Sequence, residues 1–475
     1  MGLAMQMHSP YPKLGPLLSL VSVLCACTLW QTAWGAGKPA APNLVLIISD
    51  DQAWTDFGFM GHDIVQTPRL DQLARQSVLF PRGYVPTSLC RPSLMTLATG
   101  LYAHQHLTTG NDPSPALAPP ASNAYKELRS RLIDHIDRQP TLAQLLGAQG
   151  YRSHQSGKWW EGSYRRGGFT HGMTRGFPEP GGRHGDDGLK VGRQGLQPVL
   201  DFMRSAVQQE TPFFVWYAPF LPHSPHNPPE RILRRYRVPG RPAKLAKYYA
   251  MCEWFDETCG QLLDALTDLE VQKNTLVAFV TDNGWIQRTA GTKVPAGWRP
   301  QFAPRSKQSP YEGGVRTPIM LRWPGRIPAA RRDELVSSID LAPTLLAAAN
   351  GDAPANLPGL NLLPLATHNR PLQRDALFGE GFAHDIANLG VPEASLLYRW
   401  CIRDRWKLVL TYDGQVNRYQ AVHDSRATRP QLFDLLADPH EEQNLAKQHP
   451  AVVAELASRI DQWWPVRQRK TVVTP

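Results

Sequence analysis

Continuous apolar runs are the strongest constraint on the fold of this chain. The run at residues 44–48 contains only Leu, Val and Ile. Similar runs occupy residues 213–218 and 275–281, and a shorter one occupies residues 318–323. None shows the polar alternation of a half-exposed strand. Such runs predict strands buried on both faces, as in a parallel sheet covered by helices.

Helical patterns lie between these runs. Apolar residues recur at helical spacing in the segments 68–77, 141–149 and 247–269. Strands that alternate with helices predict an open α/β sheet. The expected fold class is therefore α/β, with a large mixed or mostly parallel sheet flanked by helices.

The last hundred residues have a different character. From about Asp375 the pattern changes to short strand-like pieces at 400–403 and 406–412, followed by a helical segment at 450–464. We predict a small α+β subdomain with an antiparallel sheet and a helix. The expected division is a signal peptide at 1–36, an N-terminal catalytic domain at 37–374, and a C-terminal subdomain at 375–475.

The N-terminus has the pattern of a secretory signal peptide. Lys13 precedes an apolar stretch at 14–30, and cleavage is expected near Gly35 or Ala36. The stretch is too short for a membrane anchor, and no second one follows. We expect an exported protein, periplasmic or secreted, without a stable membrane span. Residues 24–27 resemble a degenerate lipobox, so a lipid-anchored form is an alternative.

The charge of the chain favours an anionic ligand. Hydrophobic residues make up 42% and charged residues 19% of the sequence, which is a globular composition. The formal net charge is +10. The arginines are scattered and form no basic helix, which argues against nucleic acid as the partner.

Four cysteines follow the predicted signal peptide. Cys252 and Cys259 lie on one predicted helix, about 10 Å apart along its axis. That separation is too large for a disulfide, so they are expected to pack in the core, and Cys401 carries no motif. Cys90 differs because it starts a predicted helix that ends at Gly100. The free N–H groups and the dipole of such a helix start favour an anion.

Acidic residues close two of the predicted strands. Asp50 and Asp51 follow the first run, and Asp282 and Asn283 follow the run at 275–281. The carboxyl ends of parallel strands share one edge of a sheet, where ligands bind. Their hard oxygen ligands suit Ca²⁺ or Mg²⁺ and not Zn²⁺. The alternative for each pair alone is a helix cap or a solvated turn.

The segment 88–100 resembles the signature Cys-x-Pro-Ser-Arg-x-x-x-x-Thr-Gly of type I sulfatases, of the alkaline phosphatase superfamily. In that family the cysteine is oxidised to formylglycine. Further segments are similar to family elements in the family's order, namely 43–51, 281–284, 156–159, 222–225, Lys307 with 311–318, and 431–445.

The resemblance implies a role for each matching residue. It implies that Ca²⁺, or alternatively Mg²⁺, is held by Asp50, Asp51, Asp282, Asn283 and the formylglycine derived from Cys90. It also implies that Lys158, Lys307 and His223 bind the substrate and take part in catalysis. Conversion of Cys90 would require a formylglycine-generating maturation enzyme. The implied function is hydrolysis of a sulfate ester, carried by a sulfated glycan or small molecule, by an arylsulfatase-like enzyme.

Two positions depart from the family pattern. Leu94 stands where the family has arginine, on the helix face that also carries Cys90. Trp160 stands where the family has histidine, and an indole has no acceptor nitrogen for acid–base work. His223 would then protonate the leaving group alone, or His104, His106 or His154 would assist.

Two other functions remain open from the sequence. One is a phosphodiesterase or phosphonate monoester hydrolase of the same superfamily, because tetrahedral anions differ little in shape. The other is a non-catalytic protein that binds a sulfated glycan. The sequence also leaves open which ester is cleaved, exo or endo action, and the oligomeric state.

Overall fold

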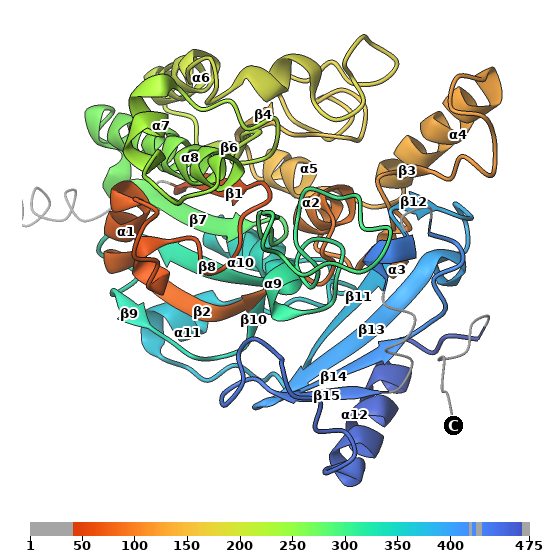
Figure 1. The fold of residues 1–475 in the computed structure, drawn as a ribbon. Helices are drawn as coiled ribbons and strands as arrows, with labels where there is room; N and C mark the ends of the chain where they lie inside the picture. Colours follow the sequence, from red (N-terminus) through yellow and green to blue (C-terminus); the bar gives the residue numbers. More distant parts are fainter. Residues whose placement is uncertain (1–40, 418–419, 424–429, 468–475) are drawn as a thin grey trace, which may run out of the picture. The chain divides into compact units, whose positions relative to one another are not determined.

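The structure is a computed structural model that describes residues 41–417, 420–423 and 430–467 (Figure 1). The predicted signal peptide lies outside these residues. Within them, no helix combines the length and the apolar composition that a membrane crossing requires.

The main sheet has nine strands and confirms the predicted α/β class. Its order is β10-β2-β8-β7-β1-β6-β4-β5, and β9 also pairs with β2. Only β8 runs antiparallel to its neighbours, so the sheet is mixed and mostly parallel. The strands are β1 (Asn43–Ser49), β2 (Val78–Tyr84), β4 (Arg152–Gly157), β5 (His171–Gly172), β6 (Phe213–Ala218), β7 (Thr275–Thr281), β8 (Arg316–Arg322), β9 (Ala330–Arg331) and β10 (Val336–Ser337).

Twelve α-helices lie among the described residues, and several cover the two faces of this sheet (Figure 1). They are α1 (Pro68–Arg75), α2 (Cys90–Thr99), α3 (Ala103–His106), α4 (Asn123–Ile133), α5 (Leu142–Ala148), α6 (Gln197–Gln208), α7 (Glu230–Tyr236), α8 (Ala243–Asp268), α9 (Glu312–Val315), α10 (Leu341–Ala348), α11 (Leu363–His368) and α12 (Pro450–Trp463).

Strand β1 shows why the sheet needs helices on both faces. Leu44, Leu46 and Ile48 belong to the core that α2, α5, α10 and α11 cover, whereas Val45 and Ile47 belong to the core beneath α1, α6 and α8. Successive side chains of a strand point to opposite faces. An apolar run without alternation therefore fills two cores, as predicted.

Most predicted elements match the structure closely. The runs at 213–218 and 275–281 are β6 and β7, and α2 begins at Cys90 and ends before Gly100, whose φ of 72° suits glycine. Helix α8 begins one turn earlier than predicted, at Ala243, because Pro242 caps it. Strand β8 begins two residues early, at Arg316, since the proline at 318 lies beside a bulge in the β2–β8 pairing.

The C-terminal part contains the predicted antiparallel sheet and helix. Its order is β11-β13-β14-β15, and α12 packs on it through Leu456 and Ile460. The division into domains at residue 375 stays a prediction. The strands are β11 (Leu377–Phe382), β13 (Leu396–Arg403), β14 (Trp406–Thr411) and β15 (Gln431–Asp434), and a further pair is formed by β3 (Asp112–Pro113) and β12 (Asp385–Ile386).

A buried ion cluster joins the C-terminal sheet to α9. The ammonium of Lys407 on β14 lies 3.0 Å from a carboxylate oxygen of Glu312 and 3.0 Å from one of Glu441. All three side chains are almost completely buried. Removing one partner of such a cluster leaves charge uncompensated in the interior.

We expect Lys407→Met to lower the free energy of unfolding by about 3 to 5 kcal/mol, because two buried carboxylates lose their shared cation. Urea denaturation would measure it. Lys126→Met, which changes an exposed lysine of α4, serves as the control and should leave the transition unchanged. Equal midpoints for the two variants would contradict the cluster's structural role.

Candidate active site

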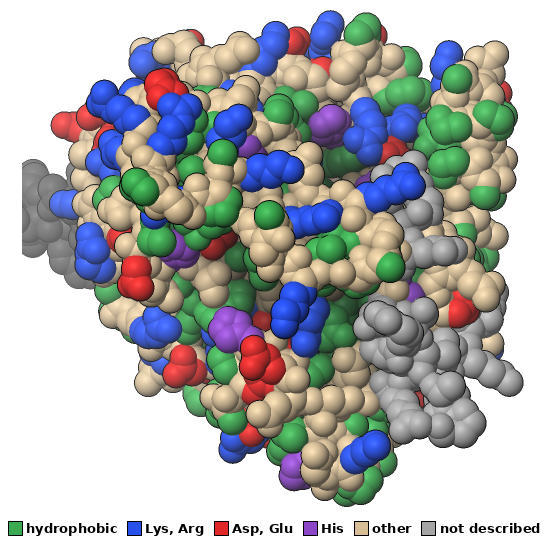
Figure 2. Space-filling view, in the orientation of Figure 1, with side chains coloured by type: hydrophobic (Ala, Val, Ile, Leu, Met, Phe, Trp, Pro, Cys, Tyr) green, Lys and Arg blue, Asp and Glu red, His purple; other side chains and the backbone are tan. Residues whose placement is uncertain are grey.

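A pocket of about 260 Å³ opens beyond the carboxyl ends of β1, β4 and β7. Figure 2 shows basic side chains gathered around a hollow in the face over α2. Residues from nine separate segments line the pocket, among them Asp51, Cys90, Lys158, His223 and Lys307. The position agrees with the rule that open α/β sheets bind ligands at this edge.

The acidic residues meet because β1 and β7 are parallel neighbours in register. Ser49 pairs with Thr281, so the residues that follow each strand are brought together. The amide of Asp51 donates to Oδ1 of Asp282 at 3.1 Å, and Nδ2 of Asn283 donates to Oδ1 of Asp51 at 2.7 Å. Asp51 has a φ of 65°, a left-handed conformation that Asp tolerates better than most residues.

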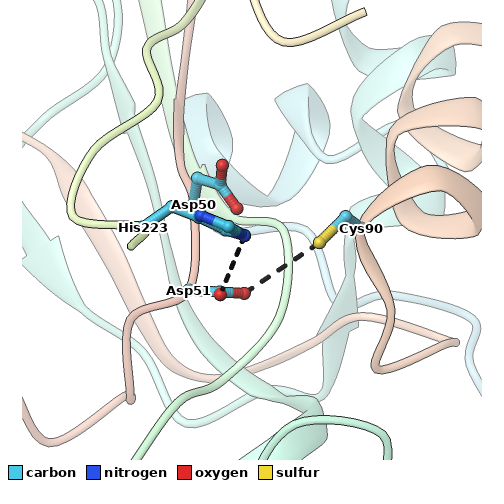
Figure 3. A group of neighbouring side chains, drawn as sticks. All are labelled: Asp50, Asp51, Cys90 and His223. Atoms are coloured by element: carbon cyan, nitrogen blue, oxygen red, sulfur yellow. Dashed lines mark hydrogen bonds and ion pairs between the residues drawn. The ribbon is translucent and has the colours of Figure 1, made fainter. Parts of the chain in front are cut away.

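Cys90 reaches this cluster from the first position of α2. Its Sγ lies 3.0 Å from Nζ of Lys307 and 4.0 Å from Oδ1 of Asp51. Figure 3 shows the side chains of Asp50, Asp51, Cys90 and His223 pointing toward one another. Burial, offset in part by the two nearby lysines, raises the pKa of the Cys90 thiol to about 12.

Two lysines are buried against the acids. Lys158 follows β4 and donates to Oδ1 of Asp50 at 2.7 Å. Lys307 precedes α9 and donates to Oδ1 of Asp51. Burial opposes their charge, but the neighbouring carboxylates outweigh it and raise both lysine pKa values. A solvated surface lysine, the ordinary alternative, is excluded at both positions by this burial.

The imidazole of His223 points one nitrogen into the pocket. Nδ1 lies 2.5 Å from the carbonyl oxygen of Ser224, which can only accept, so Nδ1 carries the hydrogen. Nε2 faces Oδ2 of Asp51 at 3.4 Å. Arg193 donates to the backbone carbonyl of His223 at 2.7 Å and helps to fix this segment. Burial lowers the pKa of His223 to about 4.

The donor set fits a hard divalent cation. Four buried oxygens at the cluster have no hydrogen-bond partner among the described residues: Oδ2 of Asp50, Asp51 and Asp282, and Oδ1 of Asn283. Ligand atoms of Asp50, Asp51, Cys90 and His223 lie within 4.8 Å of one another. Burial raises the pKa of Asp50 to about 7. Unpaired buried oxygens are costly, and a cation would compensate them.

The structure shows what surrounds Leu94 and Trp160, the two residues that depart from the family pattern. Leu94 is buried in the core beneath α2. The guanidinium of Arg91 is also buried and donates to both oxygens of Glu161, so it does not replace an arginine at position 94. Trp160 lines the pocket, and its ring centre lies 5.9 Å from Cζ of Arg91 and 4.6 Å from Cζ of Arg183.

None of the histidines proposed from the sequence as substitutes lines the pocket. His104 binds Glu380 at 2.6 Å, His106 contacts Thr96, and His154 packs on Phe202. His184 and His384 line it instead. His184 lies in the segment 165–195, which is rich in Gly and Arg, and this composition, typical of a loop, is the only sequence signal for it. No motif pointed to His384.

Comparison with known proteins decides the family. The sequence matches the Sulfatase family over residues 42–351 and the family described as N-sulphoglucosamine sulphohydrolase, C-terminal, over residues 305–464. The chain belongs to the sulfatase family. By that membership it is a sulfuric ester hydrolase, and the resemblance noted in the sequence is confirmed.

Two curated human sulfatases are about 30% identical to the chain over the aligned residues. Human N-acetylgalactosamine-6-sulfatase is 30% identical over 411 residues, 78% of this chain and 74% of that protein. Human arylsulfatase A is 31% identical over 395 residues, 74% of this chain and 72% of that protein. The similarity thus covers most of both sulfatases.

Solved structures share the fold at lower identity. A Pseudoalteromonas sulfatase superposes with a TM-score of 0.66 at 18% identity, covering 90% of this chain and 92% of that one. The phosphonate monoester hydrolase of Agrobacterium radiobacter gives 0.65 at 20% identity, covering 91% and 97%. A protein solved with its substrate, D-glucosamine-2-N,6-O-disulfate, gives 0.63 at 18% identity, covering 89% and 97%.

We expect Ca²⁺ to stabilise the protein through the four unpaired oxygens, by about 2.7 kcal/mol at roughly 100 times its Kd. Thermal unfolding with and without Ca²⁺ would measure the gain. Asp282→Asn should abolish most of it by removing one carboxylate. Asp264→Asn is the matched control, because Asp264 is exposed and pairs with Arg69. An equal gain in both variants would place the ion elsewhere.

Proposed function

We propose that the protein is an exported sulfatase that hydrolyses a carbohydrate sulfate with a formylglycine nucleophile derived from Cys90, next to a divalent cation, Ca²⁺ or Mg²⁺. One observation carries the proposal. Cys90, two buried lysines and four unpaired acidic or amide oxygens form one cluster at the base of the pocket. A thiol packed only for stability would not require such surroundings.

The charges of the site support an anionic ester as the substrate. Asp50, Asp51 and Asp282 supply three negative charges when ionised, and Lys158 and Lys307 supply two positive charges. The net charge of these five groups is −1, and a bound divalent cation would change it to +1. A sulfate monoester carries one negative charge and would neutralise that excess. Such fixed charges also stabilise charge that develops during transfer.

Each residue has a task in this proposal. The oxygens of Asp50, Asp51, Asp282 and Asn283 would hold the cation, which supplies Lewis-acid stabilisation of the sulfate oxygens when bound. Conversion of Cys90 would supply a hydrated aldehyde, with one hydroxyl to attack sulfur and a second through which sulfate can be expelled. The ammonium groups of Lys158 and Lys307 would orient the sulfate.

His223 is placed for proton transfer. Because Nδ1 is held by the carbonyl of Ser224, Nε2 is the nitrogen that faces the pocket. In the neutral imidazole this Nε2 is an acceptor, so we assign it a proton relay. It would take the proton that the attacking hydroxyl gives up and pass it to the leaving oxygen, a role that depends on a group positioned within hydrogen-bond reach. Trp160 cannot share this role, since its indole has no acceptor nitrogen.

The remaining parts of the proposal rest on the relatives and the N-terminus. N-acetylgalactosamine-6-sulfatase and a protein bound to a disulfated glucosamine support a sulfated carbohydrate as substrate. The signal-peptide pattern supports export, with a lipid-anchored form as the alternative. A formylglycine-generating enzyme would convert Cys90 although Leu94 replaces the family's arginine.

Hydrolysis of a phosphodiester or a phosphonate monoester is the second candidate. The phosphonate monoester hydrolase with the same fold supports it, and the pocket contains no feature that distinguishes phosphorus from sulfur.

We expect 4-nitrophenyl sulfate to be hydrolysed with a higher kcat/KM than bis(4-nitrophenyl) phosphate by protein from its native host. Cys90→Ala should lower that turnover by about 10³-fold or more, because the nucleophile is lost. Cys401→Ala is the control, since it removes a buried thiol of the C-terminal sheet. A faster phosphodiester reaction would favour the second candidate, and full turnover in Cys90→Ala would contradict both.

A further inference from the structure

Arg183 is a cation of the pocket that the proposed chemistry does not use. Three lining residues carry lysine or arginine charges, namely Lys158, Lys307 and Arg183. The lysines are buried and bound to Asp50 and Asp51 beside Cys90. Arg183 comes from a separate segment, pairs with Asp112 and not with Asp50 or Asp51, and is 41% exposed. It thus meets a different part of any substrate whose sulfate lies at Cys90.

The guanidinium of Arg183 is held in place from two sides. Its Nε donates to Oδ2 of Asp112 at 3.0 Å, and its Nη2 donates to the same carboxylate. Its Cζ lies 4.6 Å from the ring centre of Trp160, within the range of a cation–π contact. Trp160 is itself buried, so its ring supports the arginine and leaves no open face for a sugar.

Arg183 shares its carboxylate partner with a second arginine. Asp112 is almost completely buried and also binds Arg129, at 2.8 Å. One carboxylate therefore serves two guanidinium groups. The neighbouring Arg91 adds no charge, because Glu161 neutralises it.

Part of the guanidinium remains available to a ligand. The hydrogen bonds of Arg183 to described residues use Nε and Nη2, and Nη1 takes part in none of them. Guanidinium groups donate in a planar fork that suits the oxygens of carboxylates and sulfates. Because Asp112 and Trp160 fix the group in advance, little side-chain entropy is lost on binding.

We propose that Arg183 forms a second anion subsite, which binds another acidic group of the same substrate. The ligand is then a carbohydrate that carries, besides the reacting sulfate, a carboxylate or a second sulfate. Asp112 and Trp160 are positioning residues for this subsite. The inference rests on the proposed function and narrows its substrate class.

The experiment compares ligands that differ by one charge. Isothermal titration calorimetry on Cys90→Ala protein would give Kd for a disaccharide with one sulfate and one uronic acid, for its carboxyl-reduced counterpart, and for a disulfated disaccharide. We expect the reduced ligand to bind about tenfold more weakly than either acidic ligand, which corresponds to about 1.4 kcal/mol. Whichever of these two ligands has the lower Kd shows whether Arg183 prefers a carboxylate or a sulfate.

Two variants in the same background make the test specific. Arg183→Gln should bring the affinities of the three ligands within twofold of each other. Arg175→Gln is the matched control and should retain the difference, because Arg175 is exposed, pairs with Asp187 and Glu179, and does not line the pocket.

The inference is overturned if the Cys90→Ala protein with Arg183 intact binds the three ligands alike or binds none of them. It is also overturned if the difference in affinity persists after Arg183→Gln. Hydrolysis of 4-nitrophenyl sulfate by protein that retains Cys90 is measured separately. Turnover without charge discrimination would reject the subsite alone, whereas discrimination without turnover would reject the proposed hydrolysis alone.

Discussion

The parallel pairing of β1 with β7 is the constraint on which the site depends. Its register places Ser49 opposite Thr281, so that two acidic pairs leave the sheet side by side. A shift of one residue would turn every side chain of β1 to the other face. The two hydrophobic cores, with Leu44 and Leu46 in one and Val45 and Ile47 in the other, prevent that shift. The packing that stabilises the sheet therefore also positions the site.

The cluster at this edge is a balance of buried charge. Carboxylates at such depth are costly unless they are paired. Lys158 and Lys307 pair with one oxygen each of Asp50 and Asp51, and the second oxygen of each carboxylate remains without a hydrogen bond to the described residues. The arrangement is thus incomplete as a set of ion pairs alone, and a divalent cation would complete it. Asp112 is likewise a buried carboxylate with cationic partners, and it pairs with both Arg129 and Arg183.

The parts predicted from sequence are those that short segments determine. Apolar runs predicted β1, β6 and β7 within one residue at each end, because strands buried on both faces are mostly apolar. Helix α2 was predicted from Pro92 and Gly100, whose backbone preferences mark a helix start and end. The residues expected to form the site were named from strand ends and family motifs. The structure brings Asp50, Asp51, Asp282, Asn283, Cys90, Lys158, His223 and Lys307 together.

The rim of the pocket could not be predicted, since long-range contacts build it. Asn111 and His384 meet only because β3 pairs with β12, more than 250 residues later in the chain. Arg183 is oriented by Asp112 and Trp160 from two other segments. The sequence likewise offered His104, His106 and His154 as proton donors, but each is held in contacts away from the pocket. No local pattern distinguishes these histidines from His184.

The central claim is that Cys90 is converted to formylglycine even though Leu94 occupies the helix face beside it. The mass of the peptide that contains Cys90, from protein purified from its native host, tests this most directly. The account predicts the mass of an aldehyde or its hydrate in place of the thiol. An unmodified thiol in fully exported protein would contradict it, and the site would then have to act without the proposed nucleophile.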